Sequence, residues 1–251
     1  MNKLRSYSFH FRTNRALRRT RRGVALLVTL ASVFGFASLS SPSLLAQTFP
    51  PHAKKGKPEA LILGDSVTSI LGVGDQGLIA LNKLHRVVYG AHGCQLLLLP
   101  GCIAETKESA LKVFRGARGK FSDVVIVTTG YNEFDDRSLV DAIRKFKAEA
   151  KRQKVSLVWL TYRENGNVKE KSKRFNSILR KAAAKDPKFL LYDWNEFTLG
   201  KTGWYSGDQI HMSLRGGLHL AKYIGRIIRE VVLVRKTKTE STATTTPALA
   251  P

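Results

Sequence analysis

The sequence has few cysteines, few acidic residues and no long apolar run. Only two of its 251 residues are cysteines, Cys94 and Cys102, and together with nearby His92 they are too few for a structural zinc site. The longest apolar stretch, residues 23–37, is shorter than the roughly 20 residues that a transmembrane helix needs. We therefore expect no metal centre and no simple membrane span.

Acidic residues are scarce beside basic ones: 19 Asp and Glu face 42 Lys and Arg, a formal net charge of +23. Nucleic acid is one partner for such a chain. However, the basic residues are spread over several predicted helices, and no nucleic-acid-binding motif accompanies them, so we expect no nucleic acid partner. The net positive charge creates a long-range electrostatic field that would attract an anionic cell-envelope polymer or a membrane surface, and we favour such a partner. The alternative is a basic surface that is simply well solvated.

The first 46 residues have the composition of an export signal or an N-terminal anchor. Eight basic residues and no acidic one precede residue 23, and the apolar stretch follows directly, which is typical of a secretory signal. Without those eight charges, 42 − 8 = 34 Lys and Arg remain against 19 acidic residues, about +15. The sequence therefore predicts an exported protein that is secreted, periplasmic or associated with the cell envelope. Whether the segment is cleaved or kept stays open.

Composition also marks the limits of the folded unit. Residues 47–57 have the features of a linker, with two adjacent prolines and two adjacent lysines. Residues 235–251 contain Thr, Ala, Pro and Lys without an apolar period, which predicts a disordered tail. One domain is therefore expected over residues 58–234, a length that suits a single α/β domain.

Strand-like and helix-like segments alternate along this domain. Strands are expected at 59–63, 123–129, 155–162 and 189–194, with one more at either 86–89 or 95–99. Helices are expected at 67–84, 105–114, 138–153 and 169–184, with a last helix that ends near residue 234. This alternation predicts an α/β fold, a three-layer α/β/α sandwich with a mostly parallel central sheet.

Residues 72–77 match the glycine pattern of dinucleotide-binding proteins. That pattern binds pyrophosphate only where the strand runs directly into the first glycine. Here the first strand ends well before Gly72. We interpret the segment as a break in the helix and expect no nucleotide cofactor.

Polar residues follow the predicted strands and precede the last helix. Ser66 follows the first strand in Gly-Asp-Ser, Asn132 follows a later strand in Gly-Tyr-Asn, and Asp208 and His211 precede the last helix. Taken singly, such residues are ordinary helix N-caps or turn residues. Because loops at the carboxyl edge of a parallel sheet converge, however, the four can share a site. His211 could then activate Ser66, Asp208 could orient His211, and the Ser66 N–H and Asn132 amide could bind an oxyanion.

In this order, the blocks resemble the SGNH (GDSL-type) hydrolases over about residues 58–234. Residues 208–213, followed by two glycines and an apolar helix, are especially similar to the last block of that family. The resemblance implies a flavodoxin-like fold. It also implies the roles of nucleophile, base, orienting carboxylate and oxyanion donor for Ser66, His211, Asp208 and Asn132.

The chain departs from the family pattern in two places. Glu133 stands where the family usually has Asp, outside the direct chemistry. The family's second block supplies a third oxyanion donor from a glycine N–H, and this glycine has no clean match; we favour the N–H of Cys94, with Gly101 as the alternative. Candidate pocket residues are Asp65, Tyr131 and Trp204, although Trp204 could instead close the core.

An even pair of cysteines in an exported chain predicts a disulfide between Cys94 and Cys102, which would brace the loop with the third donor. The sequence predicts an exported serine esterase that hydrolyses short-chain acyl or acetyl esters on envelope glycans or lipids through an acyl-enzyme. One alternative is an O-acyltransferase that uses the same residues. Another is a catalytically silent binding module for an anionic polymer. No cofactor is expected.

Overall fold

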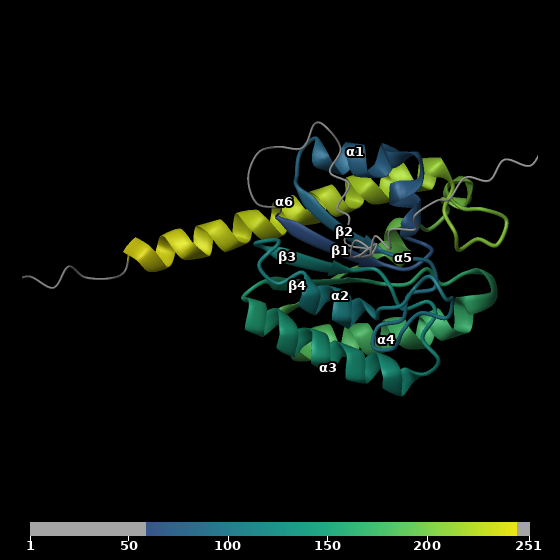
Figure 1. Cartoon of the computed structure of the whole chain (residues 1–251), viewed down its shortest axis with the longest axis horizontal. Helices are drawn as coiled ribbons and strands as arrows, with labels where there is room; N and C mark the ends of the chain where they lie inside the picture. The colour runs from purple at the N-terminus through teal and green to yellow at the C-terminus, as the bar shows by residue number, and fades with distance from the viewer. Residues whose placement is uncertain (1–58, 245–251) are drawn as a thin grey trace, which may run out of the picture. The chain divides into compact units, whose positions relative to one another are not determined.

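A sheet of five parallel strands lies at the centre of the fold, between two layers of helices (Figure 1). The computed structural model describes residues 59–244, with side chains as far as residue 237. The strands are β1 (Ala60–Gly64), β2 (Val87–Ala91), β3 (Val124–Val127), β4 (Ser156–Leu160) and β5 (Phe189–Tyr192). Their order across the sheet is β2-β1-β3-β4-β5. The prediction of a parallel α/β fold is confirmed.

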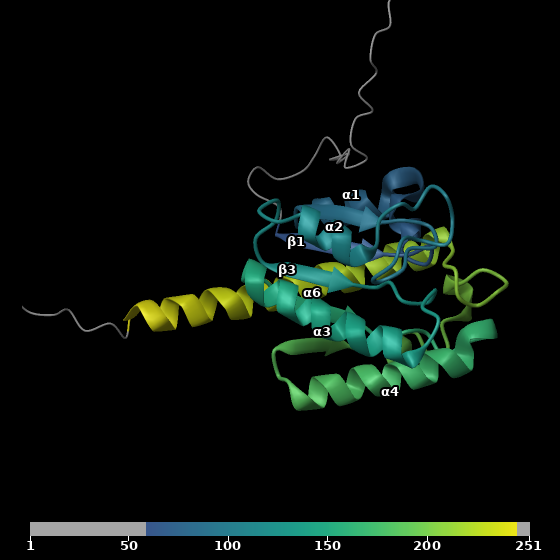
Figure 2. The same ribbon diagram turned by 60° about the horizontal axis from the view of Figure 1, so that its bottom comes forward.

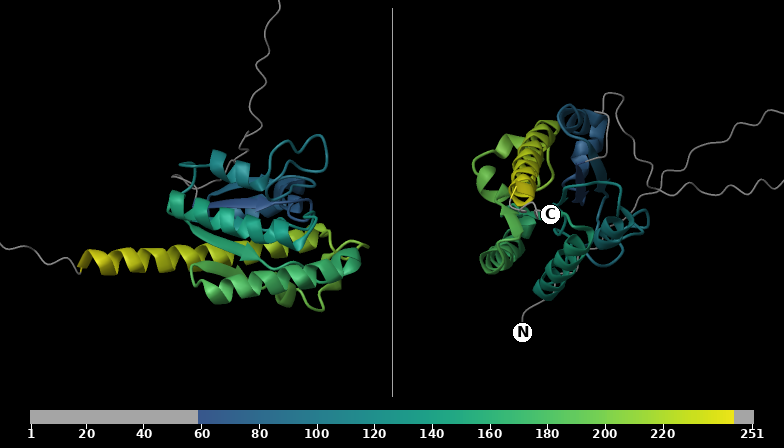
Figure 3. Two further views of the ribbon diagram at one scale, coloured as in Figure 1. Left: turned by 90° about the horizontal axis from the view of Figure 1, so that it is seen from below. Right: turned by 90° about the vertical axis from the view of Figure 1, so that its left-hand side faces the viewer.

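The helices cover both faces of the sheet. They are η1 (Ser69–Asp75), α1 (Gln76–Asn82), α2 (Ala110–Gly116), α3 (Asp136–Gln153), η2 (Gly166–Val168), α4 (Lys169–Lys185), α5 (Trp194–Phe197), η3 (Thr202–Trp204) and α6 (Leu214–Thr244). Figures 2 and 3 show α2, α3 and α4 on one face, with α1 and α6 on the other. This is the predicted three-layer sandwich.

The central strands are buried on both sides because their alternate residues enter two different cores. In β1, Ala60 and Ile62 pack toward α1 and α6, whereas Leu61 and Leu63 pack toward α2 and α3. All four side chains are fully buried. Successive side chains of a strand point to opposite faces, so a strand covered on both sides is a continuous apolar run.

Most predicted elements agree with the structure to within about two residues, but some differ more. The second strand is β2, which overlaps the first of the two alternatives, 86–89, and residues 95–99 form no strand. Helix α2 begins at Ala110 rather than 105, because the Ser109 side chain caps it by accepting from the Lys112 N–H at 3.2 Å. The expected helix 67–84 is divided into η1 and α1 at Gly74, whose φ is +60°; this is the predicted break.

Helix α6 also differs from the prediction, because it continues to Thr244 instead of ending near residue 234. Residues 235–244 lack an apolar period, but they contain no proline or glycine to interrupt the helix. Arg235 also holds the helix to the sheet side: its guanidinium donates to the Lys154 carbonyl at 2.9 Å and lies 3.5 Å from Asp123. The expected disordered tail therefore does not begin at residue 235.

The predicted export signal or anchor, residues 1–46, and the linker, residues 47–57, lie outside the described residues. Export stays a prediction. Within residues 59–244, no helix is both long and apolar enough to cross a membrane.

Candidate active site

The expected polar residues lie in loops at the carboxyl edge of the sheet. Ser66 follows β1 and Asn132 follows β3, and these two strands are hydrogen-bonded neighbours. Asp208 and His211 lie in the loop that leads into α6. The topology thus brings together residues that are widely separated in the chain.

Ser66, His211 and Asp208 form a continuous chain of hydrogen bonds. The Nε2 atom of His211 lies 2.9 Å from Ser66 Oγ, and its Nδ1 atom lies 2.5 Å from Asp208 Oδ2. Because an ionised carboxylate can only accept, Nδ1 carries the proton of a neutral imidazole here, which leaves the Nε2 lone pair for the serine proton. This is the geometry that a serine nucleophile and its base require.

Asp208 is held in its ionised form by hydrogen bonds. The His211 side chain contributes most to lowering the pKa of Asp208, followed by the Ile210 N–H. Asp208 Oδ1 accepts from the N–H groups of Ile210 and His211 at 2.9 and 3.0 Å. The side chains of Asp208 and His211 are each 48% exposed, so solvent and substrate can reach this end of the site.

A buried arginine that sequence reasoning missed supports the Asp208–His211 loop. Arg163, just after β4, is 4% exposed and donates from Nε to the Gln209 carbonyl at 2.8 Å. Its guanidinium also lies 3.7 Å from the ring centre of Tyr205. Next to it, Gly166 (φ +58°) lets the chain pass the loop, since a Cβ atom there would lie 2.4 Å from the Asp208 carbonyl oxygen. The only sequence signal for Arg163 is its place after a strand.

The Asn132 side chain offers an unused hydrogen-bond donor. Its Nδ2 atom is buried and has no hydrogen-bond partner among the described residues. Buried donors are normally paired, so an unpaired one that follows the strand next to β1 is suited to an oxygen that arrives with a substrate.

The two candidates for the third oxyanion donor differ in whether their backbone N–H already donates a hydrogen bond within the protein. The Gly101 N–H donates to the Thr106 carbonyl at 2.9 Å and is therefore occupied. Within residues 59–244, no hydrogen bond engages the N–H of Cys94 or of Ser66. Of the two alternatives, Cys94 is the one with an available donor.

Asp65 is not a pocket residue, contrary to the expectation from its place beside Ser66. It is fully buried. Its Oδ1 accepts from the Val67 N–H at 3.1 Å, and its Oδ2 accepts from the N–H groups of Gly130 and Tyr131 at 3.1 and 3.2 Å. Burial raises its pKa to about 6, against the opposing effect of these hydrogen bonds. Asp65 therefore ties the loop after β1 to the loop after β3.

The other two candidate pocket residues are also used within the protein. Trp204 is 9% exposed, and its ring stacks on His219 with centroids 3.8 Å apart. It closes the core under α6, which is the alternative that the sequence left open. Tyr131 is partly buried; its hydroxyl accepts from the Arg163 N–H at 2.7 Å, and its ring packs edge-on against Tyr162.

The predicted disulfide between Cys94 and Cys102 is confirmed, with Cα atoms 5.5 Å apart. The loop that it closes is also fastened by the Thr106 hydroxyl, which donates to the Gly93 carbonyl at 2.5 Å. The His92 N–H donates to the Gly64 carbonyl at 3.1 Å, which joins this loop to the end of β1. The disulfide therefore braces the backbone around the Cys94 N–H.

Glu133 links the Asn132 loop to the segment after β2. Its carboxylate is buried, and it accepts from the Leu97 N–H at 2.5 Å. Burial is the main cause of its raised pKa. From the sequence, Glu133 was a mild departure from the family pattern with no direct role in the reaction. In the structure it supports the loop that carries Asn132.

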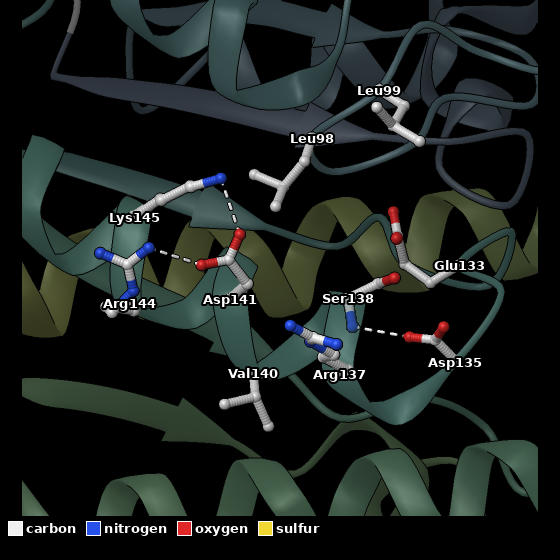
Figure 4. A pocket seen from close by; sticks show the side chains of 10 residues that line it. All are labelled: Leu98, Leu99, Glu133, Asp135, Arg137, Ser138, Val140, Asp141, Arg144 and Lys145. Carbon is white, nitrogen blue, oxygen red and sulfur yellow. Dashed lines mark hydrogen bonds and ion pairs between the residues drawn. The ribbon is translucent and has the colours of Figure 1, made fainter.

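An open cavity of about 630 Å³ begins at Glu133 and extends along α3 (Figure 4). Leu98 and Leu99 form one wall, and residues of α3 form the other. On that helix, Asp141 pairs with both Arg144 and Lys145 at 2.6 Å. The volume of the cavity is in the range of small-molecule binding sites. Glu133, which lines it, is the residue after Asn132 in the sequence. No sequence pattern indicated it.

The glycine-rich segment 72–77 has a structural role. Gly74 makes the turn between η1 and α1, and a Cβ atom at Gly77 would lie 2.9 Å from Leu71 Cα. Among the side chains that the structure describes, no group of three or more His, Cys, Asp or Glu residues could hold a metal ion.

No family model matches the sequence, and no curated protein matches it. The fold does match solved structures. A Bacteroides fragilis protein described as an acylhydrolase superposes with a TM-score of 0.56 at 14% identity, covering 79% of this chain and 99% of its own. A Slackia heliotrinireducens protein described as an SGNH hydrolase gives 0.52 at 20% identity, covering 68% and 98%.

A third match is the C-terminal catalytic domain of peptidoglycan O-acetyltransferase A from Streptococcus pneumoniae, solved with a methylsulfonyl adduct. Its TM-score is 0.51 at 17% identity, and the match covers 72% of this chain and 97% of that domain. At these identities the matches establish the fold. The chain has the flavodoxin-like SGNH hydrolase fold, as the resemblance implied.

Removing the disulfide should destabilise the protein. Its loop has a sequence separation of 8, and closing a loop of that size is worth about 2–3 kcal/mol in the chain-entropy model. We expect Cys94→Ser/Cys102→Ser to lower the free energy of unfolding in urea by that amount. Dithiothreitol should lower the melting temperature of the wild type but not that of the double variant. An equal response of both proteins to reductant would contradict the assignment.

Asp65 should make stability depend on pH. Its pKa of about 6 in the folded protein lies above the ordinary 3.8, so the folded state binds the proton more tightly. Its contribution to stability is fully present below the unfolded pKa and is lost as the pH rises through about 6. At about 1.4 kcal/mol per pKa unit, the loss is about 3 kcal/mol.

Urea unfolding of the wild type and of Asp65→Asn, which cannot titrate, measures this loss. The free energy of unfolding of the wild type minus that of the variant should be about 3 kcal/mol smaller at pH 7 than at pH 3.5. The same difference at both pH values would mean that burial does not raise this pKa.

Proposed function

We propose that this protein is a serine esterase that acts through an acyl-enzyme. The observation that carries the proposal is the chain of hydrogen bonds from Asp208 to His211 and from His211 to Ser66, at 2.5 and 2.9 Å. It lies at the ligand-binding edge of a sheet with the SGNH hydrolase fold. An intact chain of this kind favours an enzyme over a silent binding module.

In the first half of the reaction, Ser66 Oγ attacks the ester carbonyl carbon while His211 Nε2 takes the hydroxyl proton. The negative charge that develops on the carbonyl oxygen is stabilised by the Asn132 amide and by the N–H groups of Ser66 and Cys94. When this intermediate collapses, the bond to the alcohol oxygen breaks and His211 returns the proton to the alcohol. The acyl group is then bonded to Ser66.

In the second half, water takes the place of the alcohol. His211 removes a proton from the water as its oxygen attacks the acyl carbon, and the same donors hold the new oxyanion. Collapse releases the carboxylic acid and restores the Ser66 hydroxyl. Asp208 keeps the imidazole in the correct tautomer and stabilises its protonated form in both halves.

The substrate class that we propose is a short-chain acyl or acetyl ester on a cell-envelope glycan or lipid. Three observations support it. The first is the export-type N-terminal segment, and the second is the excess of Lys and Arg over Asp and Glu, which remains without that segment and attracts anionic polymers and surfaces. The third is the half-exposed Asp208–His211 pair, which leaves the site open to a large alcohol. Acylhydrolase and peptidoglycan O-acetyltransferase are the names of two proteins that share the fold.

An O-acyltransferase would use the same residues and pass the acyl group from Ser66 to a sugar hydroxyl. The name of the pneumococcal domain with this fold is the observation that favours it. The two functions differ in the product. An acylated sugar formed from p-nitrophenyl acetate and an oligosaccharide acceptor would identify a transferase, whereas acetate as the only acyl product would identify an esterase.

We expect the protein to hydrolyse p-nitrophenyl acetate and to be labelled covalently at Ser66 by a fluorophosphonate, because His211 makes that hydroxyl nucleophilic. Mass spectrometry of peptides locates the adduct. Ser66→Ala should lose both labelling and hydrolysis, while Ser177→Ala, which alters an exposed serine of α4, should lose neither. An adduct on another residue, or none, would contradict the nucleophile assignment.

Asp208→Asn should lower kcat by about 10²-fold, since an amide cannot stabilise the imidazolium and favours the wrong tautomer. The change should leave the melting temperature almost unchanged, because Asn can still accept the Ile210 and His211 N–H groups at this exposed position. Both quantities are measured on the same preparation. An unchanged kcat with a lowered melting temperature would leave Asp208 with a turn-forming role only.

A further inference from the structure

The backbone on both sides of Asn132 is bonded to a lysine from another element. Lys171, in the first turn of α4, donates from Nζ to the Tyr131 carbonyl at 2.6 Å. The same ammonium donates to the Glu133 carbonyl at 3.3 Å. One side chain thus holds the residue before Asn132 and the residue after it.

Other groups bind the rest of this loop. The Asp65 carboxylate accepts the N–H groups of Gly130 and Tyr131 at 3.1 and 3.2 Å. The Tyr162 hydroxyl donates to the Thr129 carbonyl at 3.0 Å. A carboxylate therefore binds the N–H groups of the loop, and an ammonium binds its carbonyl groups.

The position of the Lys171 ammonium is favoured neither by the dipole of its helix nor by contact with solvent. A positive charge in the first turn of a helix is at the unfavourable end of the helix dipole. The side chain is half-buried, and this desolvation is the main cause of its lowered pKa. It forms no close ion pair with a carboxylate among the described side chains. The more distant charge of Glu133, then that of Asp65, opposes the effect of burial on its pKa, and the bonds to the two carbonyls hold the ammonium in place.

We propose that Lys171 is a positioning residue for the oxyanion donor Asn132. By fastening the two flanking carbonyls, it fixes the backbone from which the Asn132 amide extends, so that Nδ2 faces the substrate oxygen before the reaction begins. The proposal rests on the esterase function proposed above. It also accounts for a buried Nδ2 atom that has no partner in the described part of the protein.

This role has a kinetic signature. An oxyanion donor acts in the transition state rather than in the ground state, so loss of its position lowers kcat with little change in KM. Removing such a donor costs about 10²–10³ in kcat. Displacing it should cost less, and we expect Lys171→Met to lower kcat about tenfold.

Lys173→Met is the matched control. Lys173 lies on the same helix, is exposed, and pairs with Glu170 at 3.0 Å. Together with Asn132→Ala and the double variant Lys171→Met/Asn132→Ala, these proteins form a double-mutant cycle on p-nitrophenyl acetate hydrolysis. If Lys171 acts through Asn132, Lys171→Met should lower kcat about tenfold when Asn132 is present and have little effect when it is absent. Lys173→Met should leave kcat unchanged.

Amide hydrogen exchange provides a second readout that does not need esterase activity. Lys171→Met should speed exchange of residues 130–133 about tenfold and leave the later turns of α4 unchanged, whereas Lys173→Met should change neither. A wild type without esterase activity would overturn the proposed function alone. Unchanged exchange in residues 130–133, or the same fall in kcat with and without Asn132, would overturn the role of Lys171.

Discussion

The buried carboxylate of Asp65 is the interaction on which the candidate site depends. Ser66 and Asn132 lie on loops after neighbouring strands, and the sheet alone brings those loops together only to within a strand spacing. Asp65 joins the two loops directly, because its carboxylate accepts backbone N–H groups from both of them. Taking a charged carboxylate out of water is costly, and three hydrogen bonds are the compensation. The nucleophile and the oxyanion donor are therefore fixed relative to each other.

The acid–base half of the site depends on the packing of α6. Gly217, in the first turn of that helix, allows close contact: a Cβ atom there would lie 2.9 Å from Ile70 of η1. This contact places the loop before α6 over Ser66. Arg163 holds the same loop from below by bonding the Gln209 carbonyl. A cation that binds main-chain carbonyls thus recurs in two loops of the site: the buried Arg163 binds the His211 loop, and the half-buried Lys171 binds the Asn132 loop.

These supports lie in hydrogen-bonded loops, while the His211 and Asp208 side chains are accessible to solvent. The loops around Ser66 are held by buried hydrogen bonds and by a disulfide, but the His211 and Asp208 side chains are half-exposed. Supports of this kind suit a reaction that needs donors in place before charge develops. An open front and the charged cavity along α3 suit a large alcohol. In the function that we propose, the buried hydrogen bonds around Ser66 therefore determine the chemistry. The exposed residues in front of the site determine the choice of substrate.

The sequence by itself determined the features that depend on neighbouring residues. Apolar runs predicted the strands, and the position of Ser66 and Asn132 directly after strands identified them as candidate site residues. The two cysteines predicted the disulfide.

Only the tertiary structure decided the features that depend on distant contacts. The sequence placed Asp65 in a pocket and left Trp204 open between a pocket and the core, but both are buried by segments far away in the chain. The occupied N–H of Gly101 left Cys94 as the available donor. Lys171 carried no signal, because the carbonyls that it binds lie about 40 positions earlier. Whether a polar side chain faces substrate or protein is settled by what packs against it, and local sequence does not contain that information.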